Sequence, residues 1–417
     1  MPGPRKGLLR RLALDTRPLA VPAYRRLLLG QSAALVGTMV TETAVPVQIY
    51  RMSHSSLYVG LTGLAGVVPI VAFGLYGGAI ADSMDRRRLS VAASLLTWSV
   101  TLLLLAQAVL GLHSVAAVLA LVAVQSAGFA IASSARGAII PQLVPADMVA
   151  AANTLNFTTG NVAQVAGPLL AGVLVSLPHG FGYAYGVDAV LFAGVLYATV
   201  RLPPIVPAAA ARAGTRAVVE GLRFIAARPV LLTSFAVDIA AMTLAMPRAL
   251  FPQAAQTRFH GGIGLLYASL AIGSVLAGLV SGWIGRVRRQ GVALACAAAG
   301  WGAAMALAGQ ARTLWLAVLL LMLAGAADLV SAVYRQTMLQ TYAPDEMRGR
   351  MQGVFTVVVS GGPPLGDLRA GSLAAATSLG VAWSGSSLLC VVLVLGGAVA
   401  VRPFWTYDAH APAPGRA

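Results

Sequence analysis

The segment TLWLAVLLLMLAGAADLVSAVY, residues 313–334, is a continuous apolar stretch in which Asp328 is the only charged residue. A bilayer core about 30 Å thick requires about 20 apolar residues in a helix. A transmembrane strand would alternate apolar and polar residues over about ten positions, and this segment does not alternate. Because lipid offers no hydrogen bonds to the backbone, the segment predicts a helix that crosses a membrane.

Similar apolar segments follow one another along the chain of 417 residues. Hydrophobic residues make up 58% of the chain and charged residues only 10%, against about 25% charged residues in soluble domains. The mean hydropathy is +0.80, and these values exclude a water-soluble globular enzyme. The sequence predicts an all-α integral membrane protein with twelve transmembrane helices. They are expected near residues 27–50, 57–81, 89–110, 115–135, 154–177, 183–202, 230–253, 262–285, 291–310, 313–334, 351–376 and 379–401.

Basic residues are concentrated in every second loop, and they predict the orientation of the chain. Lys and Arg favour the cytoplasmic side of a membrane, so both termini are expected in the cytoplasm, with the protein in a bacterial inner membrane. The net charge of +16 comes from short arginine clusters that are not interleaved with aromatic residues. They indicate contact with membrane lipids and not with nucleic acid. The expected cytoplasmic clusters include Arg25 and Arg26, Arg86 to Arg88, Arg212 to Arg228, Arg286 to Arg289, and Arg348 and Arg350.

The two halves of the chain resemble each other. Glycines at the ends of the second helix recur 204 positions later, and a second set of residues recurs 199 positions later. A six-helix repeat with the same orientation in both copies predicts two parallel halves around a central cavity. We expect an N-terminal bundle at 1–203, a cytoplasmic linker with an interfacial helix at 204–228, and a C-terminal bundle with a short tail at 229–417. The matched pairs include Gly60 and Gly264, Gly74 and Gly278, Gly78 and Gly282, Arg136 and Arg335, Gly167 and Gly366, and Gly172 and Gly371.

Two short motifs carry a family resemblance. The segment GAIADSMDRRR at 78–88 is similar to the conserved loop after the second helix of the major facilitator superfamily, although Ser83 and Asp85 replace a basic residue and a glycine. The segment GPLLAG at 167–172 resembles the antiporter motif of that superfamily through Gly167, Pro168 and Gly172. The resemblance implies a cytoplasmic gate in which Asp82 pairs with an arginine such as Arg136. The gate residues it suggests are Gly78, Asp82, Arg86, Arg87, Arg136 and Arg335.

Two longer segments resemble the enterobactin-exporter branch of the superfamily. They are PVQIYRMSHSS at 46–56 and TMLQTYAPDEMRGR at 337–350, and the resemblance extends in order along essentially the whole chain. It implies a proton-driven exporter of a siderophore-like or drug-like amphipathic small molecule, working by alternating access as a monomer. An importer of the same fold, or a membrane receptor or scaffold that transports nothing, are the alternatives.

No sequence motif indicates an enzyme, a cofactor or a metal site. Lys6 is the only lysine, and its surroundings do not form a phosphate-binding loop. H-E-x-x-H and G-x-S-x-G motifs do not occur. Cys296 and Cys390 lie singly within apolar segments and form no disulfide or metal framework. Energy for transport would therefore have to come from a gradient or from a separate subunit.

Charged residues within the apolar segments are the candidates for proton coupling. Each costs about 3 kcal/mol or more at the bilayer centre, so each is expected to lie against a cavity or a partner. Glu42 is the first candidate because burial disfavours the charged carboxylate, and Asp238 and Asp328 are the next. An interhelical hydrogen bond is the alternative role for each. Arg248, Asp367 and Arg369 are also expected at membrane depth, and Asp188 is expected to be a structural contact.

Polar uncharged residues within two helices are the candidates for contact with a substrate. They would be unsatisfied in hydrocarbon, and so they are expected to point inward. Packing between helices is an equally weighted alternative. The candidates are Gln31, Thr38, Asn156, Asn161 and Gln164.

Overall fold

The computed structural model describes residues 15–83, 86–136, 143–201, 215–342 and 348–408. Long helices run roughly parallel through the molecule, and the described residues include no strand. The first six long helices each cover one expected interval, because each interval is apolar over the length of a membrane span. They are α2 (Pro22–Ser53), α3 (Ser56–Ser83), α4 (Arg86–Val109), α5 (Val115–Arg136), α7 (Val149–Ser176) and α8 (Gly180–Val200).

The second half contains the same kind of helices, and short 3₁₀ or π segments interrupt or extend some of them. Its elements are α10 (Pro229–Leu244), η3 (Arg248–Leu250), α11 (Phe251–Thr257), α12 (Ile263–Leu279), η4 (Ser281–Arg286), α13 (Gln290–Ala308), α14 (Leu314–Tyr342), α15 (Arg348–Ala376), η6 (Val381–Gly385), α16 (Ser386–Ala400) and α17 (Arg402–Trp405). Within the described ranges, eight helices are long and apolar enough to cross a membrane. Each of the twelve expected intervals is largely helical in its described residues, and the interval 230–253 is interrupted between Leu244 and Arg248.

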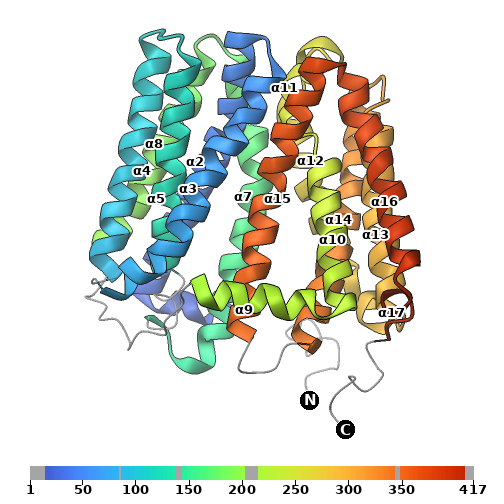
Figure 1. The fold of residues 1–417 in the computed structure, drawn as a ribbon. Coiled ribbons are helices and arrows are strands. Elements are labelled where there is room, and N and C mark those ends of the chain that lie inside the picture. Colours follow the sequence, from blue (N-terminus) through green and yellow to red (C-terminus); the bar gives the residue numbers. More distant parts are fainter. Residues whose placement is uncertain (1–14, 84–85, 137–142, 202–214, 343–347, 409–417) are drawn as a thin grey trace, which may run out of the picture.

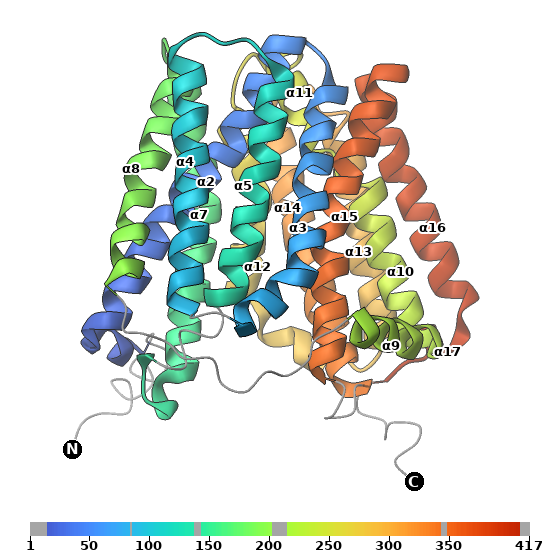
Figure 2. The same cartoon turned by 60° about the vertical axis from the view of Figure 1, so that its left-hand side comes forward.

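A short helix, α9 (Thr215–Ala226), lies across one end of the bundle, beside α10 and α15 (Figures 1 and 2). Its arginines and its apolar residues alternate with helical periodicity, which is typical of a helix at a membrane surface. We call this end of the molecule the α9 end. Helix α2 starts there and α17 lies there, while α11 lies at the opposite end.

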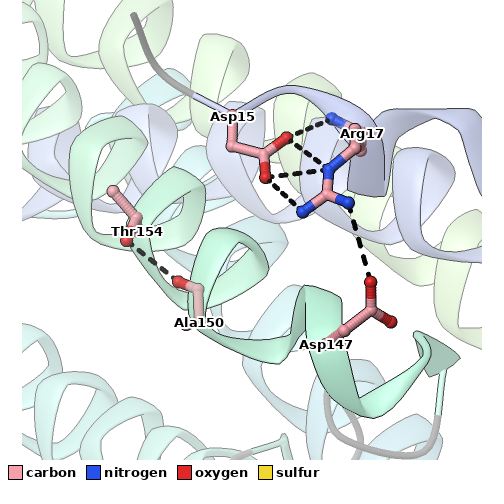
Figure 3. Close-up of polar contacts among 5 residues, drawn as sticks. All are labelled: Asp15, Arg17, Asp147, Ala150 and Thr154. Carbon is pink, nitrogen blue, oxygen red and sulfur yellow. Dashed lines mark hydrogen bonds and ion pairs between the residues drawn. The ribbon is translucent and has the colours of Figure 1, made fainter. Parts of the chain in front are cut away.

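An exposed ion-pair cluster joins the segment before α2 to the segment before α7 (Figure 3). Arg17 donates hydrogen bonds to Asp15, and its guanidinium lies 3.6 Å from the carboxylate of Asp147 in η2 (Ala146–Met148). These hydrogen bonds lower the pKa of Asp15. The three residues are largely exposed to solvent, so the cluster orients the segment before α2 more than it stabilises the fold.

Glycines bring the two halves together at the end opposite α9. A Cβ atom on Gly172 of α7 would lie 2.7 Å from Cα of Gly264 in α12, and one on Gly371 of α15 would lie 3.2 Å from Cα of Gly60 in α3. Gly60 and Gly264 are one pair of repeat-related positions, and Gly172 and Gly371 are another. The two glycine contacts therefore join repeat-related positions, and they are equivalent to each other. Both lie at the end opposite α9.

Candidate functional site

A cavity of about 600 Å³ lies between the helices of the two halves. Its volume is in the usual range for small-molecule sites, about 300 to 1,000 Å³. Most of its wall comes from α2, α3 and α5, and the opposite wall comes from η3, α12 and α15. Gly63 and Pro364 both line it and also touch each other across the halves. This contact lies about one turn along α3 from the contact between Gly60 and Gly371, so the cavity extends to the neighbourhood of that glycine contact.

Three charged side chains line this cavity: Glu42, Arg248 and Asp367. Glu42 belongs to α2, and its side chain is exposed to the cavity although protein surrounds it. Arg248 and Asp367 lie on the opposite wall and are half-buried. Among the described residues none of the three forms an ion pair within 4.0 Å. The charged ends of these side chains could therefore interact with a molecule bound in the cavity.

A break in the helix near Arg248 explains why two charges of α15 are tolerated at membrane depth. Helix α10 ends at Leu244, and the next helical turn begins only at Arg248. Arg369 donates hydrogen bonds of 2.8 Å to the carbonyls of Thr243 and Leu244, which lack helical partners. Asp367 accepts a hydrogen bond of 2.9 Å from the backbone amide of Ala249. These two side chains satisfy the backbone of the break, and they hold Arg248 at the cavity wall.

Three of the five predicted substrate-contact residues line the cavity: Gln31, Thr38 and Asn156. Asn161 and Gln164 are not part of its lining, and Gln164 is exposed. At 3.6 residues per turn, five residues rotate a helix by about 140° from a given face. Asn156 and Asn161 therefore point in different directions from α7, and contact of Asn161 and Gln164 with a substrate stays a prediction.

Of the three predicted proton-coupling residues, Glu42 alone lines the cavity. Asp238 forms an ion pair with Arg335 inside the second half, where the side chains of both residues are almost completely buried. Asp328 lies two turns before Arg335 on the same face of α14, and it interacts electrostatically with both members of the pair. The pair explains how α10 and α14 each carry a charge at this depth. It also removes Asp238 from contact with the cavity.

The predicted gate residues are only partly described. Gly78 lies in α3, whereas the side chains of Asp82, Arg86, Arg87 and Arg136 fall outside the described part of the chain. The expected pairing of Asp82 with Arg136 stays a prediction. Arg335 lies seven positions before the end of α14 and pairs with the buried Asp238. Its role as a gate residue stays a prediction.

The predicted antiporter motif provides close helix packing. A Cβ atom on Gly167 would lie 3.1 Å from the carbonyl oxygen of Val36 in α2, within the first half. Pro168 and Gly172 contact Gly264 of α12, in the second half. The motif thus forms one of the two glycine contacts that close the end opposite α9.

The sequence did not single out a buried polar network beside the cavity. Asp188 of α8 accepts hydrogen bonds from Thr41 at 2.7 Å and from Thr101 at 3.3 Å, which confirms its structural role. Nearby, Gln48 and Gln107 exchange two hydrogen bonds of 3.1 Å. Isolated polar residues within apolar segments were the signal that could have indicated these partners.

Comparison with known proteins agrees with this architecture. A family model described as transmembrane secretion effector matches residues 15–414. The chain is 29% identical over 391 residues to the enterobactin exporter EntS of Shigella boydii serotype 18 (strain CDC 3083-94 / BS512) and of Escherichia coli O81 (strain ED1a), covering 92% of this chain and 93% of each relative.

Solved transporter structures share the fold at low sequence identity. A bacterial homologue of the human lysosomal transporter Spinster superposes with a TM-score of 0.67 at 16% identity, over 94% of this chain and 97% of that one. The nucleoside transporter NupG gives 0.72 at 13% identity, over 92% and 99% of the two chains. The protein is thus a multi-pass membrane transporter of small molecules and not an enzyme. The chain belongs to the transmembrane secretion effector family of the major facilitator superfamily.

Proposed function

We propose that this protein exports a siderophore-like or drug-like amphipathic molecule in exchange for protons, from a bacterial inner membrane. The observation that carries the proposal is the cavity between the halves, in which the carboxylate of Glu42 faces a largely apolar space. The relatives named enterobactin exporter support export as the direction and a siderophore as the substrate class. An importer of the same fold is the second candidate.

The orientation we propose places the α9 end in the cytoplasm. Described arginines at this end include Arg25, Arg88, Arg223 and Arg286, whereas Arg51, Arg258 and Arg312 lie at the other end. This excess follows the preference of basic residues for the cytoplasmic side. In this orientation the glycine contacts would lie at the outer end, which supports an inward-facing assignment of the structure. Two rigid halves, 1–203 and 229–417, would exchange access by rocking about the cavity.

In this cycle Glu42 carries the proton. Outward exposure would load a proton from the outside, and inward exposure would release it to the cytoplasm as the substrate binds. A gradient of one pH unit supplies about 1.4 kcal/mol per proton, and 100 mV adds about 2.3 kcal/mol. Together these support roughly 500-fold accumulation at one proton per substrate.

Inverted membrane vesicles that accumulate enterobactin test the proposal. Wild-type vesicles should accumulate it when the lumen is made acidic, and an uncoupler should abolish the accumulation. Glu42→Gln keeps the shape of the side chain but cannot exchange a proton. It should abolish gradient-driven accumulation while enterobactin still exchanges across the membrane. Asp147→Asn, which removes an exposed carboxylate, is the matched control. Normal pH-driven accumulation by the glutamine variant would contradict the role of Glu42.

A further inference from the structure

Opposite charges occupy opposite walls of the cavity. Glu42 lies on α2, while Arg248 lies on η3 with Asp367 of α15 near it. Glu42 and Arg248 interact electrostatically across the space, yet within the described residues they are farther apart than an ion pair. Glu42 also faces the negative charge of Asp188 on α8. The wall of α2 is therefore acidic. We call the wall of η3 and α15 the basic wall, because Arg248 and Arg369 there outnumber Asp367.

Of the charges on the basic wall, Arg248 is the one whose hydrogen-bond donors are not in use. Asp367 accepts a hydrogen bond from the amide of Ala249 and interacts electrostatically with Arg248 and, more weakly, with Arg369, which itself donates to backbone carbonyls. In the described part of the chain, the guanidinium of Arg248 donates no hydrogen bond.

The main chain of Arg248, in contrast, is held firmly. Its carbonyl accepts a hydrogen bond of 3.1 Å from the hydroxyl of Tyr267, and its guanidinium carbon lies 5.6 Å from the centre of that ring. Asp367 fixes the following residue, Ala249. A guanidinium on a fixed backbone, with free donors and an aromatic ring beside it, is well suited to bind an oxyanion through two parallel hydrogen bonds.

We propose that Arg248 binds an oxyanion of the substrate, and that the cavity takes dipolar amphipathic molecules whose hydrogen-bond donors lie against Glu42. This proposal rests on the cavity being the transport site. Apolar and aromatic side chains, among them Val67, Phe129 and Phe192, supply the surface for the apolar body of such a molecule.

The charges around the cavity also favour a molecule with separated polar ends. When all five are ionised, Glu42, Asp188 and Asp367 carry one negative charge more than Arg248 and Arg369. A ligand that places its oxyanion at Arg248 and its donors at Glu42 gives each of these two side chains a partner of opposite polarity. A proton on Glu42 would remove its negative charge and so weaken, without abolishing, the acceptor for the donor end. The proton and the donor end of the substrate then compete for Glu42, while Arg248 holds the oxyanion end of the substrate. Such competition is what an exchange of substrate for protons requires.

A matched pair of fluorescent probes tests Arg248 directly. The pair is N-dansyl-6-aminohexanoate, which carries a carboxylate, and its primary amide, which has the same shape without the charge. Both are titrated into the full-length protein in lipid nanodiscs. The wild type should bind the acid about tenfold or more tightly than the amide, as a charge-assisted pair of hydrogen bonds allows. Arg248→Gln should bring the ratio to about one and leave the affinity for the amide within about twofold of wild type.

Further variants separate recognition from structure. Arg248→Lys keeps the charge without the paired donors, so it should give an intermediate ratio. Arg312→Gln removes an exposed arginine and should leave the ratio unchanged. An unchanged ratio in Arg248→Gln, no preference in the wild type, no binding of either probe, or an equal loss of both probes in Arg248→Gln would each overturn the proposal.

Enterobactin transport provides an independent outcome. Proton-driven accumulation in a protein without acid preference would overturn the role of Arg248 and leave the proposed function standing. Conversely, a clear acid preference that Arg248→Gln abolishes, without gradient-driven accumulation, would count against the export function and support the binding role.

Discussion

Adding one methyl group at a glycine contact between the halves should open the end of the cavity that the structure shows closed. In Gly172→Ala, the new Cβ would lie 2.7 Å from Cα and 2.8 Å from the backbone nitrogen of Gly264. Ordinary contacts of this kind are about 3.5 to 4.0 Å, so the two helices must move apart by roughly 1 Å. Backbone atoms cannot rotate away as the end of a side chain can.

The cost of such overpacking is typically about 1 to 3 kcal/mol. It applies to the closed state alone, because the contact is absent once the halves separate. At about 1.4 kcal/mol per factor of ten, the ratio of outward-open to closed molecules should rise about 5- to 150-fold. Gly371→Ala, at the repeat-related contact with Gly60, should act in the same direction.

The assay is the labelling rate of a cysteine placed at Thr62, which lines the cavity two residues after Gly60 of the repeat-related contact. Cys296 and Cys390 are first replaced by serine, and a membrane-impermeant maleimide is added to right-side-out vesicles. If opening is rare, the rate is proportional to the open population, and Gly172→Ala should raise it about fivefold or more.

Gly160→Ala is the control on the same helix, because its Cβ would meet Leu35 at an ordinary 3.8 Å. It should leave the labelling rate unchanged. If Gly172→Ala is folded, as judged by its elution and melting temperature, and still labels at the wild-type rate, the glycine contact does not control the outer end.

The structure supports three further predictions. Asp238→Ala leaves Arg335 without its buried counter-ion and should lower stability by about 3 to 5 kcal/mol, whereas the double variant Asp238→Asn/Arg335→Gln should lose less; thermal unfolding in detergent compares them. Arg369→Met frees two carbonyls at the end of α10 and should cost about 1 to 3 kcal/mol per unsatisfied group, and a melting temperature equal to that of wild type would show that water replaces the guanidinium. A cysteine at Ala213 in the linker should label in inverted vesicles and not in intact cells, and efficient labelling in intact cells would reverse the proposed orientation.

Hydropathy predicted the helices because lipid imposes a length and a composition on each span. The interval at 313–334 shows this well, since α14 covers it from Leu314 onward. The repeat offsets also indicated Gly60, Gly172, Gly264 and Gly371, which meet across the halves. That these four form two equivalent contacts could not be derived from the offsets, because a repeat in sequence does not specify which copies touch.

Side-chain partners were harder to predict than helices. The sequence marks Asp238 and Arg335 as isolated charges in separate apolar segments, and no periodicity connects α10 with α14. Pairing them requires the helix arrangement itself. The break after Leu244 had a local signal in Pro247 and Pro252, since proline interrupts helical hydrogen bonding. No local signal in the sequence indicated that side chains of α15 would form hydrogen bonds with the backbone groups at this break.

The intramembrane charges therefore differ in what they can contribute to transport. Asp367 and Arg369 serve backbone groups at a helix break, and Asp238 and Arg335 neutralise each other in the interior. Moving a proton onto Asp367 or Asp238 would weaken a contact that supports the fold in every state. Glu42 and Arg248 both line the cavity, and within the described residues neither has a hydrogen-bonding or ion-pair partner for its charged end. A proton on Glu42 or a ligand at Arg248 can alter binding without first disrupting the structure, which is why coupling is best sought at these two residues.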